Sequence, residues 1–305
     1  MSAPPDGSPD SPSLDSALRS GARVLADAGI DSARADVELL AAHVLGVSRG
    51  EVRTAAVLGR PAPAGLGTLV ARRAARVPLQ HLTGTAPFRT IELAVGPGVF
   101  VPRPETEQVA QAAVDEAAAV LARRPGVVVV DLCTGSGAIA LAVAHEVPGA
   151  QVHAVELDAE AYRWALRNVE AAQDAAVHLV RGDARTALRT LDGTVDVVVA
   201  NPPYIPPDAV PVDPEVREHD PAVALYGLGR DGLTVPAGVV EAAARLLVPG
   251  GLFVMEHAEV QAEAVRELVR AGGAFEQVET RQDLTGRDRM VVARRSGPDV
   301  EDSRP

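Results

Sequence analysis

The sequence predicts a doubly wound α/β domain that follows a small all-helical domain. From residue 127 onward, runs of β-branched residues alternate with segments of helical periodicity, which is typical of a mostly parallel sheet covered by helices on both faces. Residues 13–83, by contrast, show helical periodicity only. The polar ends, residues 1–12 and 296–305, are rich in Pro, Ser, Gly and Asp and are expected to be disordered.

The composition is that of a globular chain and argues against several classes of function. A net charge of -12 disfavours duplex DNA or long RNA as the main partner, because such binding depends on neutralising phosphates. Cys133 is the single cysteine, so no internal disulfide can form and a reducing compartment is expected. The sequence shows neither an apolar run of the ~20 residues that a membrane span needs nor a secretion signal. We therefore expect a cytoplasmic protein without a membrane partner.

Within the N-terminal domain, apolar residues recur on one helical face from Ser13 until Gly29 closes the segment. A second helix is expected to start at Asp31 or Ser32, because either side chain can cap it. Shorter helices are expected near residues 49–58 and 66–76. The pattern is compatible both with a structural cap that only packs and with a unit that docks a partner.

Residues 84–104 predict a β-hairpin that links the two domains. Residues 88–95 alternate roughly between apolar and polar, Gly96–Gly98 predicts a turn, and Val99–Val101 follows as the second strand. A helix then opens near Pro104 or Thr106 and begins the second domain, residues 105–295.

The second domain is predicted to alternate strands and helices in the following order. Strands are expected at 127–132, 151–157, 177–180, 195–200 and 252–256, helices at 138–145, 159–172, 235–247 and 260–270, and a terminal antiparallel pair at 275–280 and 289–294.

The strand at 195–200 ends in a rigid polar segment. Pro202 and Pro203 lack an N–H group and cannot continue a strand ladder, so the strand stops at Asn201. The prolines also hold the backbone extended. One amide side chain and two carbonyl groups are therefore fixed at the carboxyl end of a strand, where open α/β sheets bind their ligands.

A glycine-containing loop and two carboxylates follow the neighbouring strands. Gly135 and Gly137 allow a tight turn and a close ligand beside a helix N-terminus, although a turn that serves only chain geometry has the same pattern. Glu156 ends the next strand about 20 residues later, where a carboxylate can accept both ribose hydroxyls of an adenosine-type ligand. Asp183 ends the third strand and could accept from the amino group of adenine, or simply stabilise its own turn.

The sequence gives no indication of metal or hydrolase chemistry. The seven histidines lack metal-ligand spacing, and a single cysteine cannot anchor a zinc site, so no metal is expected. Neither a nucleophile elbow nor a Walker A loop is present.

Together these features resemble class I S-adenosylmethionine-dependent methyltransferases, and more narrowly the HemK/PrmC family, whose members methylate a glutamine side chain of class I peptide chain release factors. The resemblance covers about residues 14 to 294. The segments that carry it are Pro78–Gly84, Val101–Glu107, Asp131–Ala142, Asn201–Ile205, Asp231–Leu233, Pro249–Gln261 and Asp283–Arg289.

The resemblance implies a Rossmann-like sheet of seven strands, one of them antiparallel, preceded by a helical substrate-recognition domain and a hairpin. It implies S-adenosyl-L-methionine as methyl donor, S-adenosyl-L-homocysteine as product, and class I release factors as partners. The implied donor contacts are Cys133, Thr134, Gly135, Ser136, Gly137, Glu156, Asp183, Ala184 and Asn201. At two of these positions the chain departs from the family, which usually has Gly in place of Cys133 and often an aromatic residue in place of Ala184.

The resemblance also implies roles for Asn201, Pro202, Pro203 and Tyr204 in substrate binding, with Asn201, Pro202 and Tyr204 as catalytic residues. On this hypothesis, the Asn201 side-chain oxygen and the Pro202 carbonyl accept the two N–H groups of the substrate amide, while Tyr204 packs on its plane. No strong base is needed, because the nitrogen becomes acidic as the new bond forms.

Two rival hypotheses fit parts of the pattern. The Asn-Pro-Pro-Tyr segment also occurs in methyltransferases that modify adenine N6 or guanine N2 of nucleic acids, since both substrates present a planar nitrogen; the acidity of the chain and the lack of a basic stripe disfavour this. A donor-binding protein without activity would explain Cys133 and Ala184, but Asn201 to Tyr204 is intact.

Overall fold

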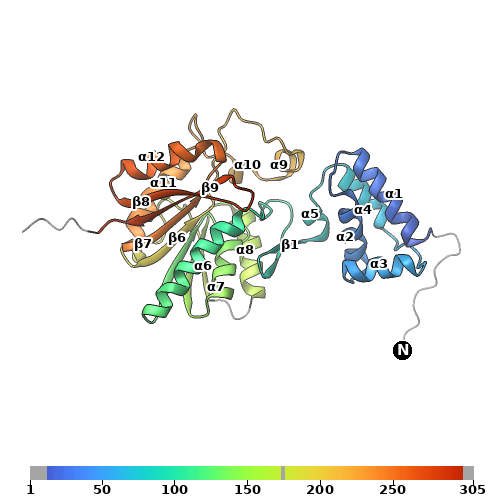
Figure 1. Ribbon diagram of the computed structural model, residues 1–305, viewed down its shortest axis with the longest axis horizontal. Coiled ribbons are helices and arrows are strands. Elements are labelled where there is room, and N and C mark those ends of the chain that lie inside the picture. The colour runs from blue at the N-terminus through green and yellow to red at the C-terminus, as the bar shows by residue number, and fades with distance from the viewer. Residues whose placement is uncertain (1–11, 173–175, 298–305) are drawn as a thin grey trace, which may run out of the picture. The chain divides into compact units, whose positions relative to one another are not determined.

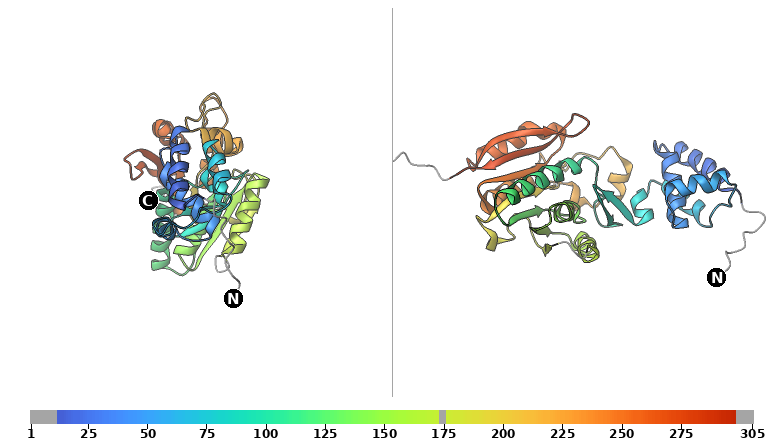
Figure 2. Two further views of the ribbon diagram at one scale, coloured as in Figure 1. Left: turned by 90° about the vertical axis from the view of Figure 1, so that its right-hand side faces the viewer. Right: turned by 60° about the horizontal axis from the view of Figure 1, so that its bottom comes forward.

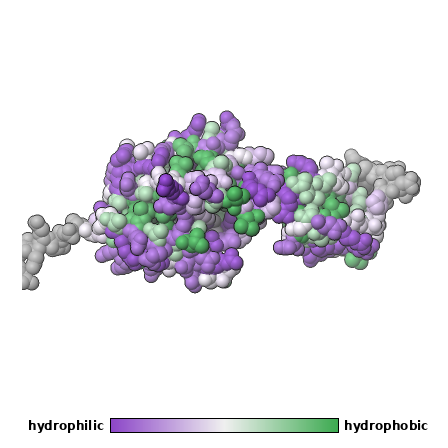
Figure 3. Space-filling view, turned by 90° about the horizontal axis from the view of Figure 1, so that it is seen from above, coloured by the Kyte–Doolittle hydropathy of each residue, from purple (hydrophilic) through white to green (hydrophobic). Residues whose placement is uncertain are grey.

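The computed structural model describes residues 12–172 and 176–297. The chain forms two compact units, residues 1–85 with 212–219, and residues 86–211 with 220–305. The ends predicted to be disordered lie almost wholly outside the described residues. No helix in the described part of the chain is long and apolar enough to cross a membrane. Figure 3 shows that both units present mostly hydrophilic side chains with separate hydrophobic patches.

The first unit is a small helical bundle whose predicted helices are confirmed (Figure 1). Its helices are α1 (Leu14–Asp27), α2 (Ala33–Leu45), α3 (Arg49–Val57), α4 (Leu66–Ala74) and α5 (Leu79–Thr83). Ser13 caps α1 and Ser48 forms a capping box with Glu51 at α3, so these helices begin where their exposed N–H groups find acceptors. Gly21 lets α1 approach α2 closely, because a Cβ there would lie 2.6 Å from Val37 Cγ2.

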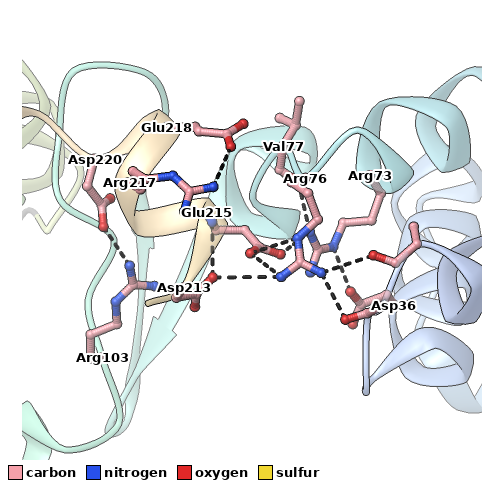
Figure 4. A network of polar contacts seen from close by, with 12 residues as sticks. Asp36, Arg73, Arg76, Val77, Arg103, Asp213, Glu215, Arg217, Glu218 and Asp220 are labelled. Carbon is pink, nitrogen blue, oxygen red and sulfur yellow. Dashed lines mark hydrogen bonds and ion pairs between the residues drawn. The ribbon is translucent and has the colours of Figure 1, made fainter. Parts of the chain in front are cut away.

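A short helix from much later in the chain completes this unit. Helix α9 (Pro214–His219) contributes Glu215, which accepts hydrogen bonds from Arg73 Nη1 at 2.7 Å and Arg76 Nε at 3.0 Å (Figure 4). Arg73 Nε also donates to Asp36 Oδ2 at 2.8 Å. Burial raises the pKa of Glu215, but hydrogen bonds with its neighbours, the two arginines among them, lower it to about 2. The sequence-based boundary, which assigned residues 105–295 to one domain, differs here from the division seen in the structure.

The second unit is built on the predicted mixed sheet, and the doubly wound α/β fold is confirmed. The strand order is β5-β4-β3-β6-β7-β9-β8, and β9 runs in the direction opposite to the other six strands of this sheet. The strands are β3 (Val127–Leu132), β4 (Ala150–Glu156), β5 (Val177–Arg181), β6 (Val195–Ala200), β7 (Leu247–Glu256), β8 (Phe275–Gln282) and β9 (Asp288–Arg295). The helices are α6 (Thr106–Arg123), α7 (Ala138–Glu146), α8 (Ala159–Ala171), α10 (Ala222–Leu225), α11 (Thr234–Leu246) and α12 (Ala262–Ala271).

Helices cover both faces of this sheet (Figures 1 and 2). From Val197 onward the side chains of β6 alternate between two apolar clusters: Val197 and Val199 join α6, α7 and α8, whereas Val198 and Ala200 join α11 and α12. Because both faces are buried, the strand is apolar at every position except Asp196, which is why its sequence is so rich in valine. Asp196 is buried but accepts a hydrogen bond from Val128 N at 2.9 Å.

The register of the three central strands determines where the site forms. Leu132 at the end of β3 lies beside Val155 of β4 on one side and Ala200 of β6 on the other. The residues that follow these strands therefore emerge together at the carboxyl edge of the sheet. Since β4 and β6 flank β3, the chain reverses its winding here, and such a switch point is where open α/β sheets bind ligands.

The linking hairpin differs from the prediction. Its strands are β1 (Thr85–Phe88) and β2 (Ile91–Ala94), so the turn lies at Arg89 and Thr90 and not at Gly96–Gly98. The Arg89 backbone N–H donates to Glu107 Oε1 at 2.9 Å, which holds the turn. The glycine at 96 serves a different purpose: a Cβ there would lie 2.5 Å from Cζ2 of Trp164, so glycine makes room for the indole ring.

Candidate functional site

The segment after β6 is rigidly enclosed. Ile205 N donates to Leu225 O at 2.8 Å, and Gly227 N donates to Ile205 O at 3.1 Å. Two glycines allow the later chain to pass very close: a Cβ on Gly232 would lie 2.3 Å from Tyr204 O, and one on Gly227 would lie 2.7 Å from Pro203 O. We call residues 225–233 the clamp segment.

A buried glutamine fastens the clamp segment to the Asn-Pro-Pro-Tyr segment. Gln261 Nε2 donates to the carbonyl oxygen of Tyr204 at 2.8 Å and to that of Asp231 at 2.9 Å. Its amide group thus satisfies two backbone acceptors that the tight packing shields from water. Gln261 was recognised only as part of the family resemblance, and the structure shows what its side chain holds.

Asn201 and Tyr204 are joined through two residues that the sequence-based site did not include. Asn201 Nδ2 donates to Thr106 Oγ1 at 3.2 Å, and Thr106 Oγ1 donates to Glu256 Oε2 at 2.8 Å. The Tyr204 hydroxyl donates to Glu256 Oε1 at 3.3 Å. Thr106 is the first residue of α6 and lies in the Pro-Arg-Pro-Glu-Thr stretch, while Glu256 is the last residue of β7. In the sequence, the signal that could have pointed to these two residues is their position, since each lies at the end of a helix or strand.

Burial dominates the electrostatics of this group. Burial raises the pKa of Glu256 to about 7, although hydrogen bonds from Thr106 and Tyr204 and the charge of Arg289 act in the opposite direction. Burial and the neighbouring Glu256 also raise the pKa of the Tyr204 hydroxyl, so it stays protonated as a donor. The His257 ring contacts the backbone of the next residue, with Nδ1 2.9 Å from Ala258 O. Burial lowers the pKa of His257.

The predicted glycine loop follows β3, the strand that pairs with β6, so it leaves the sheet at the same edge as Asn201. Cys133, Gly135 and Gly137 all have positive φ angles, of 65°, 59° and 87°. A Cβ on Gly135 would meet nothing within 4 Å, so the loop is open on that side. Asn168 of α8 supports the loop from behind, with Nδ2 donating to Ser136 O at 2.9 Å.

The structure places the Glu156 carboxylate against this loop. Its Oε2 accepts from Gly135 N at 2.8 Å and its Oε1 from Asp158 N at 2.8 Å. A carboxylate offers about four lone-pair sites, so each oxygen retains acceptor capacity for a hydroxyl group. Burial raises the pKa of Glu156, and the two backbone donors partly compensate.

Asp131 is a further candidate that sequence reasoning did not single out. Its Oδ2 accepts from Thr134 Oγ1 at 2.5 Å and Ala140 N at 3.1 Å, whereas Oδ1 is buried and has no protein partner among the described residues. Burial raises its pKa to about 7. A buried carboxylate oxygen that lacks a donor suits a cationic group, and the ammonium of S-adenosylmethionine is such a group. The loop, Asp131 and Glu156 therefore fit this methyl donor.

Asp183 and Ala184 occupy a different setting. Asp183 lies beyond β5, which β4 separates from β3, and its carboxylate is bound by Arg185 through Nε at 2.9 Å and Nη2 at 2.6 Å. That contact lowers the pKa of Asp183. Ala184 is buried in the apolar cluster beneath α11. An adenine amino group would thus compete with Arg185 for Asp183, and the predicted contact stays a prediction.

Cys133 departs from glycine at a position where glycine would be favoured. Its φ of 65° is in the left-handed region, which costs a non-glycine residue about 1 kcal/mol or more. The thiol packs against the apolar cluster on the α11 and α12 face, and burial raises its pKa, so the side chain is a neutral packing group. Within the described residues, no group of three or more His, Cys, Asp or Glu side chains could hold a metal ion.

The strand order, the glycine loop with its strand-end carboxylate, and the rigid Asn-Pro-Pro-Tyr segment define an S-adenosylmethionine-dependent methyltransferase of class I. Residues 104–213 match the family model of the methyltransferase small domain, and residues 16–84 match that of the PrmC N-terminal domain.

Similarity to curated proteins shows to which family within this class the chain belongs. The chain is 50% identical over 275 residues to the release factor glutamine methyltransferase of Streptomyces coelicolor, covering 90% of this chain and 95% of the relative. It is 45% identical over 290 residues to the protein of the same name from Mycobacterium tuberculosis, covering 93% and 92%. The chain belongs to the release factor glutamine methyltransferase family. A 4-amino-L-phenylalanine/4-methylamino-L-phenylalanine methyltransferase of Streptomyces pristinaespiralis is 42% identical over 273 residues, covering 88% and 91%.

Proposed function

We propose that the protein transfers a methyl group from S-adenosyl-L-methionine to the side-chain amide nitrogen of the glutamine in the Gly-Gly-Gln loop of class I release factors, in the cytoplasm. The observation that carries this is that Asn201, held through Nδ2 by Thr106, and the Pro202 carbonyl follow β6 at the sheet edge where the glycine loop follows β3, in a chain of this family. The proposed donor contacts are Cys133–Gly137, Glu156 and Asn201. Asp131 is added because of its buried oxygen without a protein partner among the described residues, and Asp183 is kept because of its position in the sequence.

The chemistry follows from the nature of the substrate nitrogen. An amide nitrogen is a poor nucleophile, because its lone pair is delocalised into the carbonyl. Two fixed acceptors, Asn201 Oδ1 and Pro202 O, take its N–H groups, favour the developing positive charge and aim the lone pair at the methyl group. Tyr204 packs on the amide plane. The bound donor supplies the electrophilic methyl; the protein supplies orientation and exclusion of water.

The experiment offers the purified protein and labelled methyl donor to an intact class I release factor, to its variant with Gln→Ala in the Gly-Gly-Gln loop, and to nucleic acid. We expect label in the first only. Label in nucleic acid alone would overturn the proposal in favour of the amino-directed hypothesis, and label in none of the three would favour a donor-binding protein without activity.

One comparison warrants a further substrate in the same assay. The relative from S. pristinaespiralis is named for an aromatic amine, which also presents a planar nitrogen. 4-Amino-L-phenylalanine should therefore be included. Turnover of this amine at a higher kcat/KM than the release factor would assign the chain to that chemistry.

A further inference from the structure

The structure shows an unbroken line of hydrogen bonds from the Asn201 amide to the Glu256 carboxylate, and the protons in this line have a direction. Thr106 has a single hydroxyl proton, which it donates to Glu256 Oε2 at 2.8 Å. The Thr106 oxygen can then only accept, and it accepts from Asn201 Nδ2 at 3.2 Å. Thr106 and Glu256 are both buried, so water does not offer them an alternative partner.

We propose that Glu256, acting through Thr106, is a positioning residue that orients the Asn201 amide with its Oδ1 toward the substrate nitrogen. This inference takes the identity of the substrate from the proposed function. The orientation of the Asn201 amide is argued independently of that function. Asn has a donor and an acceptor on the two branches of one amide group, and only the acceptor branch can bind a substrate N–H. With Nδ2 committed to Thr106, Oδ1 is the branch left for the substrate.

The same carboxylate holds the other side of the substrate pocket. Glu256 Oε1 accepts from the Tyr204 hydroxyl at 3.3 Å, so one buried group anchors both the acceptor amide and the ring that packs on the substrate. This gives a function to a buried threonine at the start of α6 and a buried glutamate at the end of β7, which the role of the Asn-Pro-Pro-Tyr segment alone does not explain.

Protonation of Glu256 would weaken this orientation. A protonated carboxyl can donate to Thr106, whose own proton could then turn to Asn201 Oδ1 and leave Nδ2 facing the substrate. The charged or titratable groups that act on Glu256 are Glu105 before α6, Arg289 on β9 and Tyr204. Arg289 is itself bound to Asp283, with Nη2 3.1 Å from Oδ2, so its positive charge is shared. Burial raises the pKa of Glu256 to about 7, which places this change near neutral pH.

Three variants separate orientation from mere packing. Thr106→Val keeps the shape and removes the hydroxyl, Thr106→Ser keeps the hydroxyl, and Glu256→Gln keeps the shape and removes the charge. We expect Thr106→Val to lower kcat by about 100-fold, the loss typical of a misplaced reacting group, with KM for release factor and Kd for the donor changed less than threefold. Thr106→Ser should recover most of this loss. Thr194→Val is the control, because the Thr194 hydroxyl donates to Leu191 O and Thr194 directly precedes β6, at the end of the strand away from Asn201.

The pH profile is the second measurement. In the unmodified protein kcat should rise with pH through a midpoint near neutrality, because ionised Glu256 holds the productive orientation. Glu256→Gln should lower kcat and abolish this rise. An unchanged profile in Glu256→Gln, or equal kcat values for Thr106→Val and Thr106→Ser, would refute the positioning role.

A third measurement does not depend on turnover, so it distinguishes failure of this inference from failure of the proposed function. The side-chain amide resonances of Asn201, identified by their loss in Asn201→Ala, are followed by NMR in ¹⁵N-labelled protein without substrate. They should titrate with Glu256 and shift in Thr106→Val but not in Thr194→Val. If they neither titrate nor respond to Thr106→Val, the orientation is not set by this line of hydrogen bonds, whatever the substrate proves to be.

Discussion

Single side chains at the carboxyl edge of the sheet supply the polar chemistry of the site. Asn201 is the residue on which the proposed mechanism depends most directly. Asn201→Ala removes the side-chain acceptor but leaves the glycine loop and Glu156 in place. We expect turnover to be abolished while donor binding, measured by calorimetry, stays within a few-fold of the unmodified protein. Turnover at the normal rate in this variant would reject the acceptor role.

Asp131, which we propose as a contact of the donor ammonium, also makes the stability of the fold depend on pH. Its pKa is raised from 3.8 to about 7 in the fold, so between these values the folded chain holds a proton that the unfolded chain releases. The stability that this group contributes is therefore complete below about pH 4 and is lost as the pH rises through about 7. At pH 8 Asp131 is ionised, and burying its charge destabilises the folded state.

Asp131→Asn should remove this destabilisation. The amide oxygen can still accept from Thr134 and Ala140, but the group no longer ionises. We expect the melting temperature of the variant, relative to the unmodified protein, to increase progressively from pH 5 to pH 8. Donor affinity should fall roughly 10- to 100-fold, because a charge-assisted hydrogen bond to the donor ammonium is lost. A stability difference that is constant over this pH range would contradict the assignment.

At the scale of elements, the clamp segment determines whether the Asn-Pro-Pro-Tyr segment keeps its shape. Gly232 and Gly286 have similar backbone angles, with φ of 76° and 81°, but a Cβ would meet Tyr204 O at 2.3 Å in the first case and nothing within 4 Å in the second. Alanine substitutions at these two glycines therefore distinguish the effect of close packing from the effect of backbone strain.

Gly286→Ala should cost about 1 kcal/mol in the free energy of unfolding, the ordinary strain of a left-handed residue. Gly232→Ala should cost at least about 2 kcal/mol more and should lower kcat, because the added methyl group must displace the Tyr204 carbonyl. Chemical denaturation and steady-state kinetics of both variants check this. Equal losses in the two variants would show that the close approach is unimportant.

For the whole molecule, we propose that the helical unit recognises the release factor outside its Gly-Gly-Gln loop. Removing residues 1–83 together with Glu215→Gln, since Arg73 and Arg76 leave with the deleted segment, should raise KM for the intact release factor. It should affect KM much less for a short peptide that carries the loop. The unmodified chain and Glu215→Gln alone serve as controls. A similar increase in KM for both substrates would argue that the unit only stabilises the fold.

Much of this architecture could be predicted from sequence because its signals are local. The valine runs of β3 and β6, the glycine loop and the proline pair each encode their own conformation, and parallel register then brings their ends together. The predictions were incomplete where the local structure is determined by a residue far away in the sequence. The hairpin turn depends on Glu107, the glycine at 96 on Trp164, and the start of α6 acquires its role only from Glu256.

The helix from residue 214 to 219 also has a consequence for biosynthesis. Arg73 and Glu215 are 142 positions apart, and their ion pair lies inside the first unit to leave the ribosome. At a translation rate of roughly 5–20 residues per second, Glu215 is synthesised on the order of ten seconds after Arg73. The newly made N-terminal helices must therefore persist in an incomplete form during translation, and they reach their final stability only after β6 and the Asn-Pro-Pro-Tyr segment have been synthesised.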